Sequence, residues 1–189
     1  EPNHPFTFAS GWKSPIYCDN RKTLSYPEVR TYIRDQFVNL IKTKYPQVEL
    51  IAGVATGAIA QGALVAQELG LPFVYVRSAA KNHGLENLIE GEYKEGQKVV
   101  VVEDLISTGG SSLQAVEALR NAGCDVLGMV AIFTYGFQKA IDNFTNAHCV
   151  LDTLSDYNAM IDLAQKTGYV QESDVAKLKE WRLSPESYK

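Results

Sequence analysis

The stretch VVVVEDLISTGGSS, residues 99–112, contains the pattern that decides the fold. Four consecutive valines are typical of a central strand that is covered on both faces of its sheet. Two adjacent carboxylates, Glu103 and Asp104, follow the valines directly. Because carboxylates buried without partners destabilise a fold, we expect both to face a solvated or ligand-filled crevice at the end of the strand.

The residues after the acidic pair favour a bound phosphate. Residues 107–111 read STGGS, and they supply hydroxyls and backbone N–H groups before a helix that we expect to begin near Ser111. Loops of this kind and helix N-termini bind anions, whereas carboxylates accept hydrogen bonds from sugar hydroxyls. A ribose 5-phosphate would satisfy both halves of the stretch. An isolated acidic pair before a glycine-rich turn would need no ligand.

Around this stretch the hydrophobic pattern alternates between strands and helices. Strands are expected near residues 50–54, 73–76, 88–89, 99–102, 126–133 and 149–154, and helices near 29–41, 58–69, 113–119, 139–147, 156–166 and 173–182. Residues 25–28, SYPE, are typical of a capping box with an early proline, and Gly123 is the expected C-cap of the helix at 113–119. This order predicts an α/β fold with a mainly parallel central sheet flanked by helices.

Ligands of such sheets bind beyond the carboxyl ends of the strands. Three segments should meet at that rim: residues 55–57, 77–84 and 103–111. The middle one lacks a hydrophobic pattern and contains small, polar and basic residues, which indicates an exposed loop. The sequence therefore places its most reactive side chains together at one edge of the sheet.

Composition limits the class of protein. A chain of 189 residues is long enough for a single domain, residues 1–189, with its own core. The net charge of −4 and the lack of a Lys/Arg run argue against nucleic-acid binding. No apolar run approaches the ~20 residues of a membrane helix, and we find no signal peptide. Cys18, Cys124 and Cys149 lack metal-ligand spacing, so we expect reduced thiols and a cytoplasmic protein.

The stretch 99–112 resembles the phosphoribosyl-pyrophosphate (PRPP) signature of type I phosphoribosyltransferases. Residues 53–58, GVATGA, resemble the pyrophosphate loop of that family. Residues 6–11, FTFASG, with 14–17, SPIY, resemble the base-binding segment of its orotate branch. Residues 77–84, RSAAKNHG, resemble the mobile catalytic loop of the same branch. The resemblance spans roughly residues 6–170.

The resemblance implies a type I phosphoribosyltransferase fold with a small N-terminal base-binding hood, made of residues 1–25 and the C-terminal region. It implies Mg²⁺-dependent transfer of ribose 5-phosphate from PRPP to orotate, giving orotidine 5′-phosphate and pyrophosphate in de novo pyrimidine (UMP) biosynthesis. It also implies a homodimer in which the mobile loop, residues 78–87, reaches the neighbouring site. Two alternatives stay open: a type I phosphoribosyltransferase for another nucleobase, and a non-catalytic regulator that senses PRPP.

The resemblance also assigns roles to individual residues. Lys81, His83 and Arg77 are the expected catalytic residues, because cations and a proton donor stabilise the departing pyrophosphate; Arg77 could instead make a structural ion pair. The expected PRPP ligands are Arg77, Lys81, His83, Ala55, Thr56, Gly57, Glu103, Asp104, Leu105, Ile106, Ser107, Thr108, Gly109, Gly110 and Ser111. The expected orotate ligands are Ser107, Phe8, Tyr17 and Cys18. Asp104 is expected to hold Mg²⁺ through water, and the bond between Ala55 and Thr56 to be cis.

Three positions depart from the family pattern. Ser78 and Ala9 stand where many members have lysine, and no arginine occurs between Arg120 and Arg182, where well-known members have the arginine that binds the orotate carboxylate. Lys13, Arg21 or the main-chain amides of residues 14–18 are the candidates to replace that arginine. These departures leave the choice of base less determined than the binding of PRPP.

Overall fold

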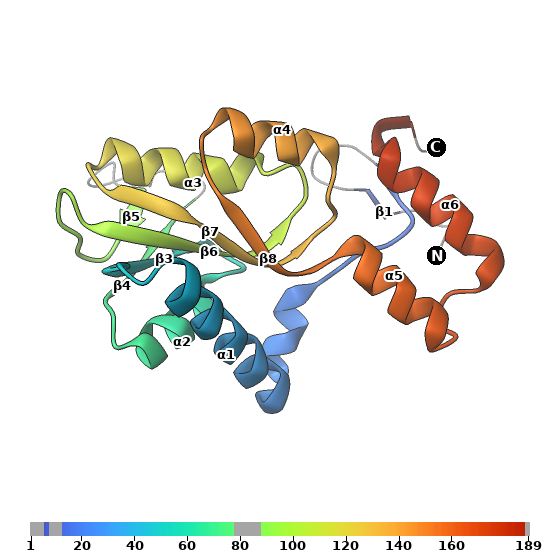
Figure 1. Cartoon of the computed structure of the whole chain (residues 1–189), viewed down its shortest axis with the longest axis horizontal. Helices are drawn as coiled ribbons and strands as arrows, with labels where there is room; N and C mark the ends of the chain where they lie inside the picture. Colours follow the sequence, from blue (N-terminus) through green and yellow to red (C-terminus); the bar gives the residue numbers. More distant parts are fainter. Residues whose placement is uncertain (1–5, 8–12, 78–87, 188–189) are drawn as a thin grey trace.

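The computed structural model describes residues 6–7, 13–77 and 88–187, and its centre is a six-stranded sheet in the order β5-β4-β3-β6-β7-β8 (Figure 1). These strands are β3 (Leu50–Val54), β4 (Phe73–Val76), β5 (Ile89–Glu90), β6 (Lys98–Ile106), β7 (Asp125–Thr134) and β8 (Leu151–Asp156). Neighbouring strands are parallel except β4 and β5. The predicted α/β fold with a mainly parallel sheet is confirmed.

The valine run lies in β6, between β3 and β7. All four valine side chains are fully buried. Val99 and Val101 belong to one hydrophobic cluster and Val100 and Val102 to another, because successive side chains of a strand point to opposite faces. A strand covered on both faces can be apolar at every position, which explains the unbroken run.

Two pairs of helices cover the sheet (Figure 1). Helices α1 (Pro27–Lys44) and α2 (Ile59–Leu69) pack on one face, where Phe37, Ile41 and Val65 contact the cluster that contains Val100. Helices α3 (Gly110–Asn121) and α4 (Gln138–Asn146) pack on the other face. Each of the four valines of β6 therefore packs in a cluster that includes helix side chains.

Three local predictions differ from the structure. The strand predicted for 99–102 continues to Ile106, because the main chain of β6 stays paired with β7 as far as Thr134. The capping box is wrong: helix α1 begins after Tyr26 without a side-chain cap, although Pro27 occupies the first turn as expected. Gly123 has φ +82°, but it lies one residue beyond the C-cap of α3.

A third hydrophobic cluster lies beyond the carboxyl ends of the strands. It joins the end of β7 to α5 (Tyr157–Lys166) and α6 (Glu172–Leu183). The Trp181 ring lies edge-on to Tyr135 and Phe137, and its Nε1 donates a hydrogen bond to the carbonyl of Lys13 at 3.0 Å. We use the word hood for the segment 13–25 together with α5 and α6, since this cluster holds them over the sheet.

The N-terminal part of the hood is short. Strands β1 (Phe6–Thr7) and β2 (Lys13–Ser14) form a small antiparallel pair, and a 3-10 helix (Asn20–Ser25) leads into α1. Ile16 and Cys18 lie between β2 and the 3-10 helix, and they pack against the third cluster. The hood therefore combines residues from both ends of the chain.

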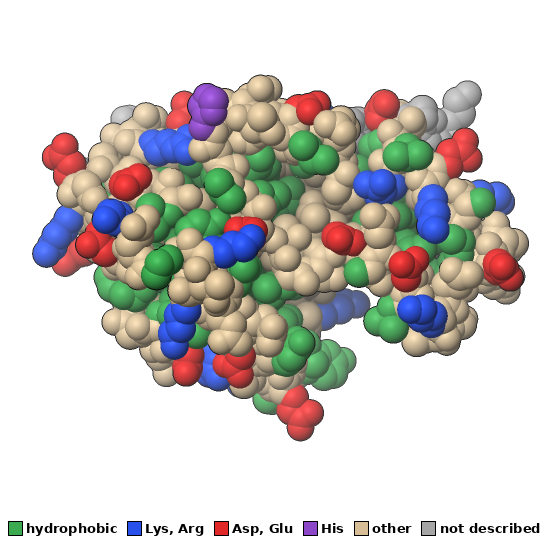
Figure 2. Space-filling model, viewed as in Figure 1, with side chains coloured by type: hydrophobic (Ala, Val, Ile, Leu, Met, Phe, Trp, Pro, Cys, Tyr) green, Lys and Arg blue, Asp and Glu red, His purple; other side chains and the backbone are tan. Residues whose placement is uncertain are grey.

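Charged side chains are interspersed over the face drawn in Figure 2, with no large patch of one sign. Arg34 of α1 pairs with Asp35 at 2.7 Å and with Glu68 of α2 at 3.4 Å, while Lys44 pairs with Asp152 of β8. Within the described ranges, no helix is both long and apolar enough to cross a membrane.

Trp181→Ala should lower the free energy of unfolding by about 3–5 kcal/mol, because it removes a buried aromatic side chain and leaves a cavity. Tyr169→Ala is the matched control: Tyr169 is 89% exposed, so its loss should change stability by less than about 0.5 kcal/mol. Urea unfolding measures both. Equal effects for the two variants would show that the third cluster does not stabilise the hood.

Candidate active site

A cavity of about 520 Å³ lies between the hood and the carboxyl ends of the strands. The residues that line it come from the hood, the β3–α2 connection, the β6–α3 connection and the end of β7: Tyr17, Cys18, Asp19, Arg21, Thr56, Gly57, Asp104, Leu105, Ser107, Thr108, Ser111 and Tyr135. The sequence analysis placed residues 55–57 and 103–111 at one rim, and both segments meet here.

The loop between β6 and α3 leads into a helix whose first N–H groups are available to an anion. Gly109, with φ +80°, precedes the first turn of α3, and no side chain caps that helix. The first N–H groups of a helix have no partner within the helix and carry a partial positive charge. Asn143 of α4 donates a hydrogen bond to the Thr108 carbonyl at 2.8 Å, which holds the loop in place.

Gly109 also has no space for a side chain. A Cβ at this position would lie 2.6 Å from a ring carbon of Phe144, in addition to the strain of its positive φ. Phe144 packs against Gly109, and Asn143 donates a hydrogen bond to Thr108. Both side chains belong to α4, so contacts with this helix fix the conformation of the β6–α3 loop.

The two adjacent carboxylates occupy different environments. Asp104 lines the cavity, whereas Glu103 is 5% exposed and does not line it. Oε1 of Glu103 accepts a hydrogen bond from the Asp104 backbone N–H at 2.9 Å, and Oε2 accepts one from the Ser112 hydroxyl at 2.7 Å. The expectation that both carboxylates face the crevice is wrong for Glu103, because alternate side chains of β6 point to opposite faces.

Burial also sets the protonation of these groups. Loss of water, followed by the hydrogen bond and charge of Asp104, raises the pKa of Glu103 to about 8. Burial, with the nearby charges of Asp104 and Asp19, raises the pKa of the Cys18 thiol to about 11. Both effects follow from placing acidic groups close together in a partly water-free space. Cys18 is therefore a poor nucleophile and a neutral wall of the cavity.

The connection from β3 to α2 forms the opposite side of the cavity. The peptide bond between Ala55 and Thr56 is cis, as the resemblance implied. Thr56 and Gly57 line the cavity, and a Cβ on Gly57 would overlap the Asp104 carboxylate. Only glycine therefore allows this connection to approach the acidic residue so closely.

Bonds across the chain hold the N-terminal segment over the sheet. Asn20 Nδ2 donates to the carbonyl of Asp104 at 2.7 Å, and the Cys18 N–H donates to the Tyr135 hydroxyl at 3.3 Å. The Tyr17 ring is 53% exposed, and its centroid lies 5.6 Å from that of Phe6. The segment 17–21 is thus fixed to β6 and to the residue that follows β7, both of which border the cavity.

The remaining predicted site residues lie elsewhere. Arg77 Nη1 pairs with Glu90 Oε1 at 3.4 Å and does not line the cavity, which matches the structural ion pair considered from the sequence. Ala55, Ile106, Gly109 and Gly110 also do not line it. Phe8, Lys81 and His83 lie outside the described residues.

Three cavity-lining residues were not predicted as ligands: Asp19, Arg21 and Tyr135. Asp19 and Arg21 follow the predicted Tyr17 and Cys18 directly, and Arg21 was considered only as a substitute cation. Tyr135 follows the end of β7, so it could have been found by asking which strand neighbours β6 at the rim. Its pKa is raised to about 12, chiefly by burial.

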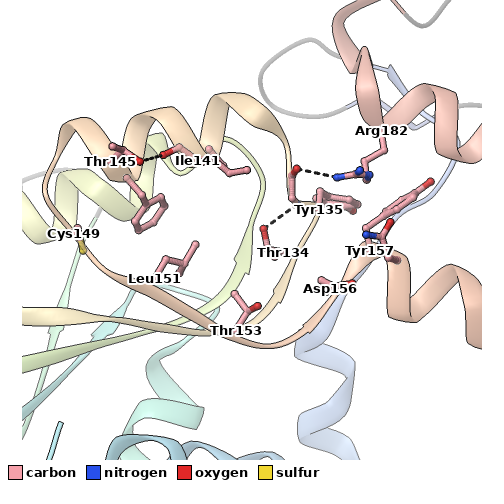
Figure 3. A pocket seen from close by; sticks show the side chains of 14 residues that line it. Thr134, Tyr135, Ile141, Thr145, Cys149, Leu151, Thr153, Asp156, Tyr157 and Arg182 are labelled. Carbon is pink, nitrogen blue, oxygen red and sulfur yellow. Dashed lines mark hydrogen bonds between the residues drawn. The ribbon is translucent and has the colours of Figure 1, made fainter. Parts of the chain in front are cut away.

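A second cavity, of about 460 Å³, lies between α4, β8 and the start of α5 (Figure 3). Arg182 lines this second cavity, and its Nη1 donates to the Gly136 carbonyl at 3.1 Å, as drawn in Figure 3. Tyr135 lines both cavities and forms a wall between them. The guanidinium of Arg182 thus belongs to the second cavity and not to the one with the phosphate loop.

Comparisons with known proteins agree with this geometry. The family model of the phosphoribosyl transferase domain matches residues 24–162. An orotate phosphoribosyltransferase of Porphyromonas gingivalis is 63% identical over 188 residues, which cover 100% of this chain and 90% of that protein.

Solved structures give the same grouping. The orotate phosphoribosyltransferase of Aeropyrum pernix superimposes with a TM-score of 0.77 at 27% identity, covering 88% of this chain and 92% of that one. The UMP synthase of Leishmania donovani has a TM-score of 0.80 at 25% identity; the match covers 94% of this chain and 38% of that longer one. The chain therefore belongs to the phosphoribosyl transferase family and, within it, to the orotate phosphoribosyltransferases.

Proposed function

We propose that this protein transfers ribose 5-phosphate from PRPP to orotate, giving orotidine 5′-phosphate and pyrophosphate in de novo pyrimidine (UMP) biosynthesis. One observation carries the proposal: a single cavity is lined by residues of the loop 107–111, by the Asp104 carboxylate and by the aromatic Tyr17 of the hood. That set of groups fits a phosphorylated sugar beside a planar base. The 63% identity to an orotate phosphoribosyltransferase over the whole chain supports the choice of base.

In this proposal each segment of the cavity binds one part of PRPP. The loop 107–111 and the first turn of α3 hold the 5-phosphate. Asp104 accepts hydrogen bonds from the ribose hydroxyls, and Thr56 with Gly57 borders the pyrophosphate. Orotate lies under the hood, beside Tyr17, Cys18 and Ser107, with Phe8 as a further expected contact.

Glu103 has a positioning role in this proposal and not a direct contact with ribose. Its carboxyl group joins the backbone of β6 to Ser112 in the first turn of α3. The bond fixes the angle at which the phosphate loop leaves the sheet. Asp104 and Ser111, on either side of this link, then face the same cavity.

The chemical step exchanges one bond for another at the anomeric carbon. The C–O bond to pyrophosphate breaks and its electron pair leaves with pyrophosphate. A ring nitrogen of orotate forms the new bond to carbon, and the proton of that N–H passes to the departing pyrophosphate. Positive charge develops on the ribose and negative charge on the leaving group. Catalysis therefore depends on cations placed at pyrophosphate and on the exclusion of water. Lys81, His83 and Arg77 supply those groups in this proposal.

Mg²⁺ fits the residues present. This ion commonly binds one or two carboxylates, water and substrate phosphates, and the Asp104 carboxylate borders the cavity next to Gly57. No set of three His, Cys, Asp or Glu side chains in the described ranges could form a metal site on its own. Asp104 would hold the ion through water, and the bound ion would neutralise charge on the pyrophosphate.

We further propose a cytoplasmic homodimer in which the loop 78–87 of one subunit reaches the site of its neighbour. Arg77, just before that loop, pairs with Glu90 and does not line the cavity of its own chain. A loop that serves the neighbouring site would account for this placement. The family resemblance supports the same arrangement.

The decisive experiment follows orotate consumption by ultraviolet absorbance with PRPP and Mg²⁺, beside uracil, adenine and hypoxanthine. Orotate turnover that requires PRPP is expected. Turnover of a purine and not of orotate would mean that the protein is a phosphoribosyltransferase for another nucleobase. Saturable PRPP binding without turnover of any base would favour a PRPP-sensing regulator.

Lys81→Ala should lower kcat by about 100-fold or more, because one lost cation at a developing charge commonly costs that much. The KM for PRPP should change far less, since the loop 107–111 and Asp104 still bind the sugar phosphate. Lys94→Ala, at an exposed position near the amino end of β6, is the control and should leave both constants unchanged. Comparable kcat in the Lys81 and Lys94 variants would remove Lys81 from the mechanism.

Glu103→Gln should change how stability depends on pH. The pKa of Glu103 is about 8 in the fold against an ordinary 4.5, so the folded state keeps a proton that the unfolded chain releases. The unaltered protein should therefore lose stability as pH rises between these two values. Glutamine keeps an acceptor for Ser112 but does not titrate.

The difference in the free energy of unfolding between Glu103→Gln and the unaltered protein should grow by more than about 1 kcal/mol from pH 5 to pH 8. Urea unfolding at several pH values measures it. Glu180→Gln, at an exposed position of α6, is the control and should show no such trend. A difference that shrinks with pH would mean that Glu103 is ionised in the fold.

A further inference from the structure

Orotate carries a carboxylate that the other nucleobases lack, and this negative charge must be compensated within the cavity. An anion moved from water into a partly enclosed site loses hydration and needs a cation or several N–H donors. The question follows from the proposed function, on which this inference rests. It can be answered from the charged groups of the cavity itself.

The described lining of the cavity contains three charged side chains: Asp19, Asp104 and Arg21. Two of them are carboxylates, which repel a carboxylate ligand. Arg21 is thus the one cation among these lining residues. Lys13 does not line the cavity, and its carbonyl is bonded to Trp181 on the opposite side of the hood. Arg182 lines the second cavity behind Tyr135.

The position of Arg21 matches the base end of the cavity. It lies in the segment 17–21, whose Tyr17 and Cys18 line the same space. Asn20, the residue before it, is anchored to the Asp104 carbonyl at 2.7 Å, and Cys18 is anchored to Tyr135. These bonds fix the backbone on both sides of the arginine. The phosphate loop lies on a different element, between β6 and α3.

Asp19 orients the guanidinium. Arg21 Nε donates a hydrogen bond to Asp19 Oδ1 at 2.8 Å. That bond uses the Nε edge, and within the described residues no hydrogen bond engages the two Nη groups. Paired Nη groups match the two oxygens of a carboxylate. The Arg21 side chain is 57% exposed, so a ligand can reach it.

We infer that Arg21 binds the carboxylate of orotate and is the residue that selects this base over uncharged nucleobases, with Asp19 holding its guanidinium in place. Asp19 neutralises part of the positive charge of Arg21. Binding of the orotate carboxylate therefore depends on hydrogen bonds from the Nη groups and not only on attraction between opposite charges. A base without a carboxylate would leave the Nη groups to water. Such a base gains nothing from Arg21.

The test compares Arg21→Gln with Arg34→Gln, a matched arginine on the outer surface of α1 that pairs with Asp35 and Glu68. Arg21→Gln should lower kcat/KM for orotate by about 10- to 100-fold, equal to about 1.4–2.8 kcal/mol. The KM for PRPP should change less than about threefold, and the rate measured with uracil should be the same as in the unaltered protein. Arg34→Gln should alter none of these constants.

Two further variants sharpen the result. Arg21→Lys keeps the charge without the paired donors, so orotate use should recover only in part. Asp19→Asn loosens the guanidinium and should cause a smaller loss than Arg21→Gln. Unchanged thermal midpoints would show that each variant is folded, as expected because neither Arg21 nor Asp19 is buried.

A parallel loss for PRPP and uracil in Arg21→Gln would overturn the inference, because Arg21 would then serve the pyrophosphate. Unchanged kinetics with orotate would overturn it as well. Failure of the proposed function would give a different result, because the unaltered protein itself would not consume orotate.

Discussion

The parallel pairing of β6 with β3 and β7 is the constraint on which the site depends. Val100 and Val102 pair with Ile51 and Gly53 on one side, and Val102 pairs with Val130 on the other. This register brings the carboxyl ends of three strands to one edge of the sheet. The cis connection after β3, the phosphate loop after β6 and Tyr135 after β7 therefore border one cavity, although they are far apart in the chain.

The alternation of side chains along β6 separates the two acidic residues. Glu103 lies on the same face as Val99 and Val101, where α3 covers it and Ser112 donates to it. Asp104 lies on the opposite face, at the point where Gly57 leaves the space open. One carboxylate thus joins β6 to the first turn of α3, and the other borders the cavity. Adjacent residues in the sequence acquire different functions because a strand has two faces.

The hood depends on side chains from both ends of the chain. Trp181 and Tyr135 pack together, and both are bonded to the N-terminal segment. Trp181 donates a hydrogen bond to the Lys13 carbonyl, and the Tyr135 hydroxyl accepts one from the Cys18 N–H. The same contacts place Asp19 and Arg21 at the cavity. Helix α6 therefore supports the proposed base-binding side without touching the cavity where orotate would lie. The electrostatic character of that side, one cation between two carboxylates, is a consequence of this packing.

The sequence by itself determined the order of strands and helices, the mainly parallel sheet and two of the segments that meet at its rim, 55–57 and 103–111. These features depend on local patterns: valine runs, helical periodicity, and glycine and hydroxyl residues at a strand end. Tertiary structure alone decided that Glu103 is buried, that Arg77 pairs with Glu90, and that Arg21 and Tyr135 line the cavity. The physical reason is that the direction of a side chain depends on strand pairing and on the elements packed over it, which lie far away in the sequence.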